Sequence, residues 1–296
     1  MLHRLIRRLG RSALQGATRG VLEHAEARDW REHLFGLSPQ RWARLNGKAF
    51  WITGAGTGYG RSLACALAAA GGTVFLTGRR VGKLEESLQE LERVFGVSPA
   101  NCHLVPADIT KQKDLEEACD SVRQRCGSLC GLVNNAAIPS TPGCAWPLRE
   151  CSAEDWQRMM DTNVRAPWLL TRAIFPHLLH GAAVRVLFIT SEAGWSGTQG
   201  FGIYNVSKAG LNSLAFSLAR EYAAANPGAD IQMNVISPGQ ARAEMNRGSS
   251  ASPYSIVSIA LILLSHPPGG PNGRFFYRDG RPLEFCDSTA YPKKLL

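Results

Sequence analysis

Tyr204 and Lys208 lie four residues apart in the segment IYNVSKAG, a spacing that places both side chains on one face of a helix. An ammonium group beside a phenol favours the ionised phenol and lowers its pKa from the ordinary value of about 10. Such a tyrosine can act as a general acid or base. The Y-x-x-x-K pattern is also common by chance, so a solvated helical pair is the alternative interpretation.

A glycine-rich segment, TGAGTGYG, joins an apolar run to a helical pattern and contains Gly54, Gly58 and Gly60. Bare backbone in such a turn lets a pyrophosphate approach, and the free N–H groups at the helix start stabilise its charge. Three residues separate Gly54 from Gly58, so the spacing departs from G-x-G-x-x-G. A tight turn that binds nothing is the alternative.

The elements that must position these residues follow from the apolar pattern. From about residue 48, short apolar runs alternate with helical periods, which is typical of βα units and a parallel sheet. Helices are expected in the intervals between the strands. We expect strands at 49–53, 73–77, 102–106, 129–134, 184–190, 231–237 and 272–276. This order predicts one doubly wound, Rossmann-type α/β domain over residues 46–296, preceded by a helical extension over residues 1–45.

The turn TGAGTGYG resembles the TGxxxGxG turn of the short-chain dehydrogenase/reductase family, in its shorter, non-extended branch. The resemblance recurs downstream to about residue 280. It implies an NAD(P)-dependent oxidoreductase that acts on CH–OH or C=O groups. It also implies that Gly54, Gly58, Tyr59 and Gly60 bind the cofactor.

Arg79 follows the second expected strand, next to a glycine that stands where relatives using NAD carry an acid. Without a carboxylate for the ribose 2′-hydroxyl, and with a guanidinium available for a 2′-phosphate, the chemistry favours NADP(H). NAD is the alternative cofactor. A solvated loop arginine is the alternative interpretation of Arg79.

Two further motifs of the resemblance follow the third and fourth expected strands. Asp108, with Ile109 beside it in PADIT, matches the family's adenine-contacting aspartate. Asn135 belongs to LVNNAAI, which is similar to the NNAG motif, although Ala137 replaces the glycine. We expect Asp108, Ile109 and Asn135 to contact the cofactor.

The resemblance implies a catalytic tetrad. Ser191 precedes Tyr204 by thirteen residues, which is the separation usual in the family, and its hydroxyl is expected to bind the substrate oxygen that Tyr204 protonates. Asn163, in DTNVRAPWLL, matches the position that links the lysine to a chain of water. Lys208 is expected to hold the nicotinamide ribose as well.

The segment NVISPGQARAEM resembles the family's loop after the sixth strand, whose backbone meets the nicotinamide carboxamide. Pro238 and Gly239 are therefore expected to bind the cofactor. Ala243 stands where many relatives carry a threonine. One hydrogen bond of about 0.5–1.5 kcal/mol is thus absent or supplied by another group.

Aromatic and apolar residues in segments that border the substrate cleft, by the resemblance, predict a bulky, largely apolar carbonyl or alcohol. Only Arg242 and Glu244 bring charge nearby. Core packing is the alternative for each aromatic residue. The residues are Trp146, Trp195, Phe201, Met245 and Tyr254.

Composition excludes several classes of protein. With 45% hydrophobic and 19% charged residues, the chain is neither disordered nor fibrous. Eight cysteines without a CxxC pair or a secretory leader indicate reduced thiols and a cytoplasmic protein. The apolar run 259–264 is too short to span a bilayer. His177 and His180 have no third ligand at a recognisable spacing, so no metal is expected.

The net charge of +9 arises mostly in the extension, because residues 1–45 hold nine arginines and four acidic residues. Apolar residues at helical spacing predict a basic amphipathic helix over 2–14. It could pack on the domain or on another subunit, lie on a membrane surface through residues 1–22, or serve as a mitochondrial presequence.

We therefore expect an NADP(H)-dependent enzyme that moves a hydride between nicotinamide and a small-molecule carbonyl or secondary alcohol. A homo-oligomer is expected, and no nucleic-acid surface, because basic and aromatic residues are not interleaved in clusters. A cofactor-sensing or scaffold protein with vestigial catalysis is the alternative from another class. Epimerisation through transient oxidation is the alternative among enzymes.

Overall fold

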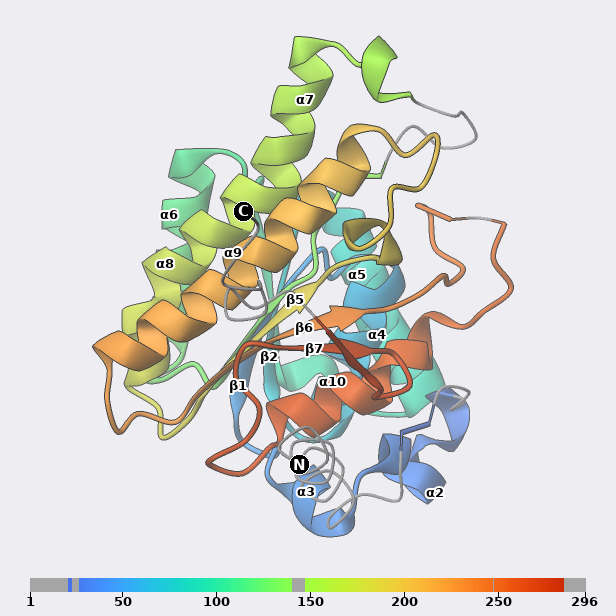
Figure 1. Ribbon diagram of the computed structural model, residues 1–296. Helices are drawn as coiled ribbons and strands as arrows, with labels where there is room; N and C mark the ends of the chain where they lie inside the picture. Colours follow the sequence, from blue (N-terminus) through green and yellow to red (C-terminus); the bar gives the residue numbers. More distant parts are fainter. Residues whose placement is uncertain (1–20, 23–26, 140–146, 247, 285–296) are drawn as a thin grey trace, which may run out of the picture.

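The computed structural model describes residues 21–22, 27–139, 147–246 and 248–284. Within these ranges one sheet has the strand order β3-β2-β1-β4-β5-β6-β7-β8 (Figure 1). The strands from β1 to β7 pair in parallel, and β8 pairs antiparallel to β7. The predicted doubly wound parallel sheet is confirmed. The bounds are β1 (Ala49–Thr53), β2 (Thr73–Gly78), β3 (Cys102–Pro106), β4 (Gly131–Asn134), β5 (Val184–Ile189), β6 (Ile231–Ser237), β7 (Arg274–Tyr277) and β8 (Pro282–Leu283).

Differences from the expected strands are small and have local causes. Strand β4 begins at Gly131 rather than at residue 129. Strand β7 begins at Arg274 because Gly273 has a φ of 66°, outside the extended region. Strand β8 was not expected, since two residues after a tight turn are too few to show an alternating pattern.

The α-helices fill the intervals between strands, as the sequence predicts. Their bounds are α2 (Trp30–His33), α3 (Pro39–Ala43), α4 (Gly58–Ala69), α5 (Val81–Glu90), α6 (Gln112–Arg125), α7 (Ala153–Met160), α8 (Ala166–Leu179), α9 (Ile203–Ala225) and α10 (Val257–Leu264). Single turns lie between them at η1 (Ala27–Asp29), η2 (Leu34–Gly36), η3 (Leu91–Phe95), η4 (Pro99–Asn101), η5 (Leu148–Glu150), η6 (Asp161–Arg165), η7 (Glu192–Gly194) and η8 (Pro253–Ile256).

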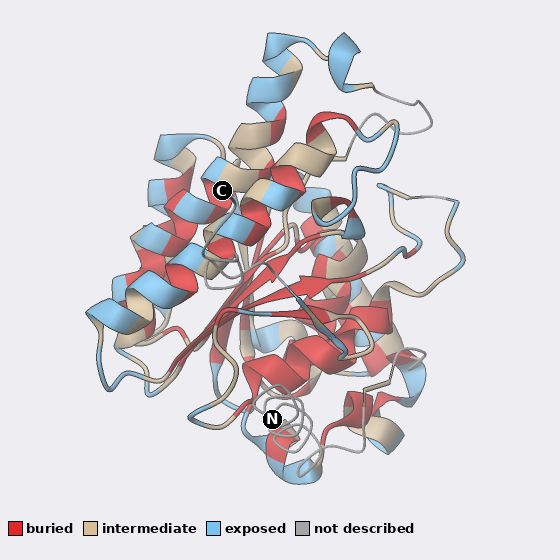
Figure 2. Cartoon of the chain, in the orientation of Figure 1, coloured by how far each residue is buried: buried red, intermediate tan, exposed pale blue. Residues whose placement is uncertain are grey.

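Helices cover both faces of the sheet. Helices α4, α5 and α10 pack on one face, and α6, α8 and α9 pack on the other (Figure 1). Every residue of β1, β5 and β6 is buried between these layers (Figure 2). Burial on both faces explains why β1 is an apolar run up to Thr53. Strands β5 and β6 also bury polar side chains, among them Arg185, Gln232 and Asn234.

Residues 27–45 of the extension pack into the same core as α4 and α10. Phe35 is completely buried and stacks on Tyr254 with ring centroids 6.2 Å apart. The indole of Trp30 stacks on Trp42 and donates a hydrogen bond to the Phe95 carbonyl at 3.1 Å. The basic helix expected over 2–14 lies outside the described residues.

Helix α10 is apolar in all but one position, and all eight of its residues are buried. Such a helix needs cover on every side. The extension supplies part of it: the Leu22 amide donates to Ser258 Oγ at 3.0 Å, and Arg41 Nη1 donates to the Ile262 carbonyl at 3.5 Å. Arg41 itself is 2% exposed.

Candidate functional site

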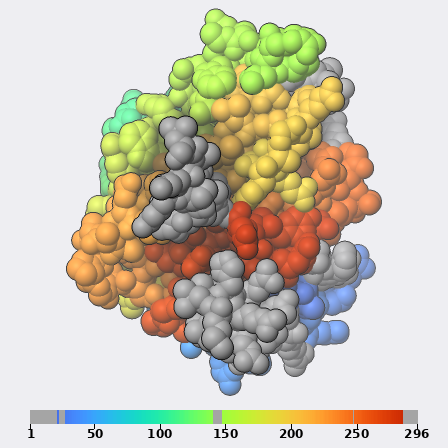
Figure 3. Space-filling model, in the orientation of Figure 1, coloured from blue at the N-terminus to red at the C-terminus, as the bar shows by residue number. Residues whose placement is uncertain are grey.

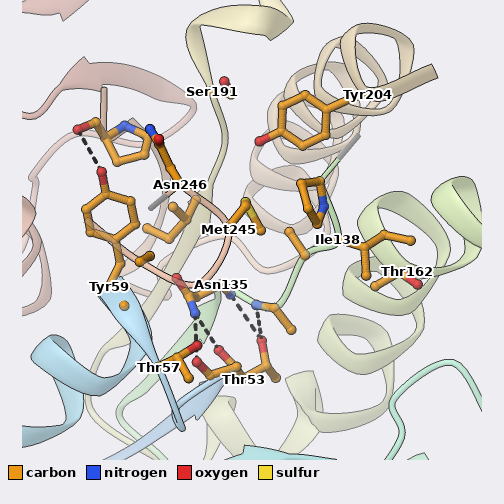
Figure 4. A pocket seen from close by; sticks show the side chains of 18 of the residues that line it. Thr53, Thr57, Tyr59, Asn135, Ile138, Thr162, Ser191, Tyr204, Met245 and Asn246 are labelled. Carbon is orange, nitrogen blue, oxygen red and sulfur yellow. Dashed lines mark hydrogen bonds between the residues drawn. The ribbon is translucent and has the colours of Figure 1, made fainter. Parts of the chain in front are cut away.

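A pocket of about 750 Å³ opens at the carboxyl ends of the central strands. Strands β1 and β4 are neighbours in the sheet although they are not consecutive, so the pocket lies at the point where the strand order reverses. Crevices at this point are the usual ligand sites of open α/β sheets. Figure 4 shows side chains from the first turn, the loop after β4, α9 and the loop after β6 around this pocket.

The glycine-rich turn forms one wall of the pocket. Gly54 has a φ of 66°, and a Cβ at Gly60 would lie 2.2 Å from the Gly54 carbonyl oxygen, so larger residues do not fit there. Helix α4 begins at Gly58, and its N-cap residue Thr57 makes no side-chain capping bond. The first N–H groups of α4 are therefore available to an anion beside the positive end of the helix dipole.

Asn135 fixes this turn against the fourth strand. Its backbone N–H donates to Thr53 Oγ1 at 3.0 Å, and its Nδ2 donates to the carbonyls of Thr53 and Gly54 at 2.9 and 3.3 Å (Figure 4). Thr53 Oγ1 also accepts from the Ala136 amide. The NNAA segment thus shapes the glycine-rich turn besides lining the pocket itself.

Cations gather at the end of the pocket beside β2. Arg79, Arg80 and Lys83 all line it. Arg80 forms an ion pair with Glu244 at 2.6 Å, and Lys83 approaches the same carboxylate at 3.8 Å. Arg79 makes no hydrogen bond or ion pair with any part of the chain that the structure describes. It is exposed, and its guanidinium is available for a phosphate.

Asp108 and Ile109 line the same end of the pocket after β3. The Asp108 carboxylate accepts bonds from the Thr110 amide and hydroxyl at 3.1 and 2.7 Å, which fixes its orientation. Ile109 is 7% exposed and offers an apolar surface. The pair suits a flat heteroaromatic ring with polar edges.

Ser191, Tyr204 and Lys208 meet at the other end of the pocket. Ser191 lies two residues after the end of β5, and Tyr204 and Lys208 lie in the first turns of α9. Lys208 Nζ donates to the Ile189 carbonyl at 3.0 Å and lies 5.6 Å from the centre of the Tyr204 ring. The serine, the phenol and the amine predicted from the sequence are thus brought together.

The pKa directions at this end differ from the expectation that Lys208 lowers the pKa of Tyr204. Burial raises the pKa of Tyr204 to about 12, against which a hydrogen bond with Ser191 acts. Burial also lowers the pKa of Lys208 to about 8. The amine loses much of its preference for the charged form, because it is desolvated beside the phenol.

Asn163 lies behind the pocket rather than in its wall. It is 1% exposed, in the irregular turn η6 between α7 and α8. Its side chain accepts from the Ile138 amide at 2.9 Å and donates to the Ile138 carbonyl at 3.1 Å and to Ser207 Oγ at 3.0 Å. Asn163 therefore positions Ile138, which does line the pocket, and the helix that carries Tyr204.

The loop after β6 forms another wall of the pocket. Pro238, Gly239, Ala243, Met245 and Asn246 line it. On the surface this loop lies next to the segment around residue 200 (Figure 3).

Two of the expected aromatic contacts are wrong. Phe201 and Met245 line the pocket, and the Phe201 ring lies 6.1 Å from that of Tyr204. Tyr254 is instead buried in the core against Phe35, with its hydroxyl bonded to Glu90. Trp195 packs edge-on against Phe275 and lies outside the pocket wall. Trp146 lies outside the described residues.

The structure adds pocket residues that the sequence analysis does not name, among them Arg80, Lys83, Glu192 and Asn246. Glu192, directly after Ser191, brings a carboxylate to the catalytic end, and Asn246 brings an amide. Glu244 was assigned to the substrate side but pairs with cations at the opposite end. Glu192 could have been predicted as a pocket residue, because it is adjacent to Ser191 in the sequence. Glu244 and Asn246 lie in an irregular loop, and no local sequence pattern predicts the path of that loop.

Within the described ranges, no three His, Cys, Asp or Glu side chains are grouped so that they could hold a metal ion. No helix of the described part is long and apolar enough to cross a membrane.

A family pattern described as short chain dehydrogenase matches residues 48–253. Sulfoacetaldehyde reductase 2 of Chromohalobacter salexigens is 30% identical over 194 residues, which cover 65% of this chain and 72% of that protein. An uncharacterized oxidoreductase of Escherichia coli K12 is 32% identical over 225 residues, covering 74% of this chain and 84% of the relative.

Solved structures give the same likeness in three dimensions. A short chain dehydrogenase from Shigella flexneri 2a, in complex with NADP, has a TM-score of 0.70 and 26% identity, covering 80% of this chain and 99% of that one. One from Escherichia coli CFT073, in complex with NADPH, has the same TM-score and identity, covering 80% and 98%.

Proposed function

This chain belongs to the short-chain dehydrogenase family, and we propose that it is an NADP(H)-dependent oxidoreductase that interconverts a carbonyl and a secondary alcohol. The observation that carries the proposal is the convergence of Ser191, Tyr204 and Lys208 at one end of a pocket that begins at an uncapped helix N-terminus. The family comprises oxidoreductases, and two similar structures contain NADP or NADPH.

The residues present fit such a cofactor. The α4 N-terminus and the close approach of Gly60 to Gly54 make a cradle for a pyrophosphate. Asp108 and Ile109 suit the adenine. Arg79 and Arg80 suit a 2′-phosphate, which is the reason to prefer NADP(H), with NAD as the alternative. Asn135, Lys208, Pro238 and Gly239 border the half that would hold the nicotinamide riboside.

When bound, the cofactor supplies the hydride that reaches the carbonyl carbon. The carbonyl oxygen then needs a proton, and the Tyr204 hydroxyl delivers it. Ser191 Oγ accepts a bond from the Ala193 amide at 3.2 Å, so its own O–H is a donor, which is bonded to Tyr204 here and would turn to the same substrate oxygen. In its charged form, Lys208 favours the phenolate that remains on Tyr204. Oxidation of the alcohol runs through the same groups in reverse.

We propose a largely apolar substrate. Ile138, Pro139, Phe201 and Met245 border the catalytic end and offer contact area with few fixed polar requirements. Polar groups lie there as well, among them the Asn246 amide and the Glu192 carboxylate. Strongly anionic substrates are disfavoured beside it, because like charges repel.

The decisive experiment follows NADPH oxidation against ketones of graded size, with NADH in parallel. We expect turnover of lipophilic ketones with NADPH. Binding of NADPH without turnover of any carbonyl or alcohol would favour the cofactor-sensing scaffold instead. Turnover confined to small polar sugars would contradict the apolar substrate.

Assembly and compartment are further parts of the proposal. Trp156 on α7 and Trp168 on α8 are 42% and 38% exposed, and exposed tryptophans favour an interface between copies. The six described cysteines are free thiols, which suits a reducing compartment such as the cytoplasm. Light scattering of the protein and of a Trp168→Glu variant tests the homo-oligomer, since the variant should have the lower mass.

A further inference from the structure

Tyr59 connects two walls of the pocket through one hydroxyl group. It is the second residue of α4, directly after the turn that begins the helix. Its Oη lies 3.2 Å from the Gly239 carbonyl oxygen and 3.4 Å from the Pro238 carbonyl oxygen, so one O–H is shared between two successive acceptors. Figure 4 shows the Tyr59 side chain in the pocket wall, with a bond drawn from its hydroxyl. The side chain is half-buried and lines the pocket.

The acceptors lie where the loop after β6 leaves the sheet. Strand β6 ends at Ser237, and Pro238 and Gly239 follow immediately. A few residues later the same loop contributes Ala243, Met245 and Asn246 to the pocket. The Tyr59 hydroxyl bonds to the first two residues of this loop and therefore fixes the distance between the start of the loop and α4.

Tyr59 belongs to the catalytic end of the pocket. Burial raises its pKa, and the charged or titratable groups that act on its hydroxyl are Arg278, Tyr204, Tyr277 and Glu192. None of these is at the end that carries Arg79. The phenol thus remains a donor at all ordinary pH values, beside the groups assigned to proton transfer.

A second contact joins the same two walls but carries no hydrogen bond. A Cβ at Gly58 would lie 3.1 Å from the Ala243 methyl group, so turn and loop are in close contact there. Ala243 has no side-chain donor or acceptor. The polar side-chain link between the glycine-rich turn and the loop comes from Tyr59.

We propose that Tyr59 is a positioning residue for the nicotinamide half of the cofactor. Its hydroxyl holds the Pro238–Gly239 backbone at a fixed distance from the start of α4. The inference rests on the proposed function. It requires that loss of the hydroxyl weakens contacts to the nicotinamide half and leaves the adenosine half unchanged.

The test is Tyr59→Phe, which removes one oxygen and keeps the ring. Dissociation constants are measured by fluorescence for NADPH and for 2′,5′-ADP, which lacks the whole nicotinamide mononucleotide half. Hydride transfer is followed in a single turnover with a ketone that the wild-type protein reduces. Tyr222→Phe is the matched control, because Tyr222 is also half-buried but lies near the end of α9, outside the pocket.

We expect Tyr59→Phe to weaken NADPH binding about twofold to tenfold and to slow hydride transfer, with 2′,5′-ADP affinity and melting temperature unchanged. Equal weakening of both ligands would assign Tyr59 a merely structural role in the turn and overturn the inference. Unchanged NADPH binding and hydride transfer in Tyr59→Phe would overturn it too while leaving the proposed function intact. Failure of the wild-type protein to bind NADPH would overturn both.

Discussion

Lys208 and Tyr204 share one face of α9, with the amine 5.6 Å from the centre of the phenol ring and bonded to the Ile189 carbonyl at 3.0 Å. The carbonyl anchors the amine at the end of β5, which is also the strand that presents Ser191. Helix and strand are therefore tied together at the point where proton transfer is proposed. The roles of the two residues can be tested separately, that of Tyr204 by substitution and that of Lys208 by the pH dependence of the rate.

Tyr204→Phe should abolish turnover and leave cofactor binding within about twofold of wild type, because the ring remains and only the acid/base oxygen is lost. Positioned acid/base groups contribute at least about a hundredfold in rate. The measurement is kcat with NADPH beside a fluorescence titration of NADPH. A variant that keeps more than about a tenth of the wild-type rate would count against the assigned role.

The pH dependence of reduction should follow Lys208. Its pKa is lowered to about 8, and that of Tyr204 is raised to about 12, so the phenol stays protonated while the amine loses its charge as pH rises through about 8. The neutral amine no longer favours the phenolate formed on proton delivery. We expect kcat for reduction to be flat below pH 8 and to fall above it.

Lys208→Arg is the control for this profile, since a guanidinium stays charged across the whole range. If the variant retains measurable activity, its profile should lack the descending limb near pH 8. If the variant shows the same descending limb, the titrating group is not Lys208. If the wild-type profile is flat up to pH 10, no group titrates in this range and the prediction is wrong.

Cofactor choice should depend on Arg79. A charge-assisted hydrogen bond to a 2′-phosphate should favour NADPH over NADH by about 1.5–3 kcal/mol. Arg79→Ala should remove most of that difference and leave NADH affinity nearly unchanged. Equal affinities of the wild-type protein for the two cofactors in a titration would reject the assignment.

The sequence predicted the site best where a short motif and the end of a strand coincide. Gly54 and Ser191 follow strands whose apolar pattern is clear, and Tyr204 lies in the first turn of a helix, so their meeting at one sheet edge could be anticipated. Tyr254 and Trp195 could not be placed in this way. Their polar partners are Glu90 and Glu284, 164 and 89 residues away in the chain, and no local pattern encodes such contacts.

Asn163 and Glu244 show a second limit of sequence-based prediction. The motif located Asn163 in the chain, but its role depends on the backbone of Ile138, which the helical pattern does not reveal. Glu244 lies in an irregular loop, and its pairing with Arg80 depends on how that loop crosses the pocket.

Stability should fall at acidic pH through His266. Burial lowers the pKa of this imidazole, the positive charges of Arg41 and Arg185 lower it further, and the Pro267 carbonyl and Asp230 act in the opposite direction. The folded state therefore binds fewer protons than the unfolded state, whose histidine pKa is about 6.5. Stability is retained above that value and lost as pH falls below it.

Thermal melts of the wild-type protein and of His266→Gln between pH 7 and pH 5 test this prediction. The difference between the two melting temperatures should shrink as pH falls, because only the wild-type protein carries the titrating group. Contributions of other histidines and carboxylates cancel in the comparison. A difference independent of pH would contradict the assignment to His266.

The extension should have two separable roles, divided near residue 20. Residues 27–45 cover α10 and bury Phe35 and Trp30, so their removal would expose an apolar helix and one face of the core. A variant lacking residues 1–45 should melt at a lower temperature and form larger particles. Phe35→Ala is the milder variant, for which we expect a loss of about 3–5 kcal/mol.

Residues 1–20 carry the predicted basic helix and are tested by a variant lacking them alone. If that helix lies on a membrane surface, the full-length protein should sediment with anionic vesicles, each nearby arginine adding about 1 kcal/mol of attraction. Binding should weaken with salt and vanish in the variant, whose melting temperature and ketone turnover should match those of the full chain, because the packed residues 27–45 remain. If the full-length protein fails to associate with anionic vesicles at low salt, the membrane interpretation is rejected, and the extension is left with its packing role.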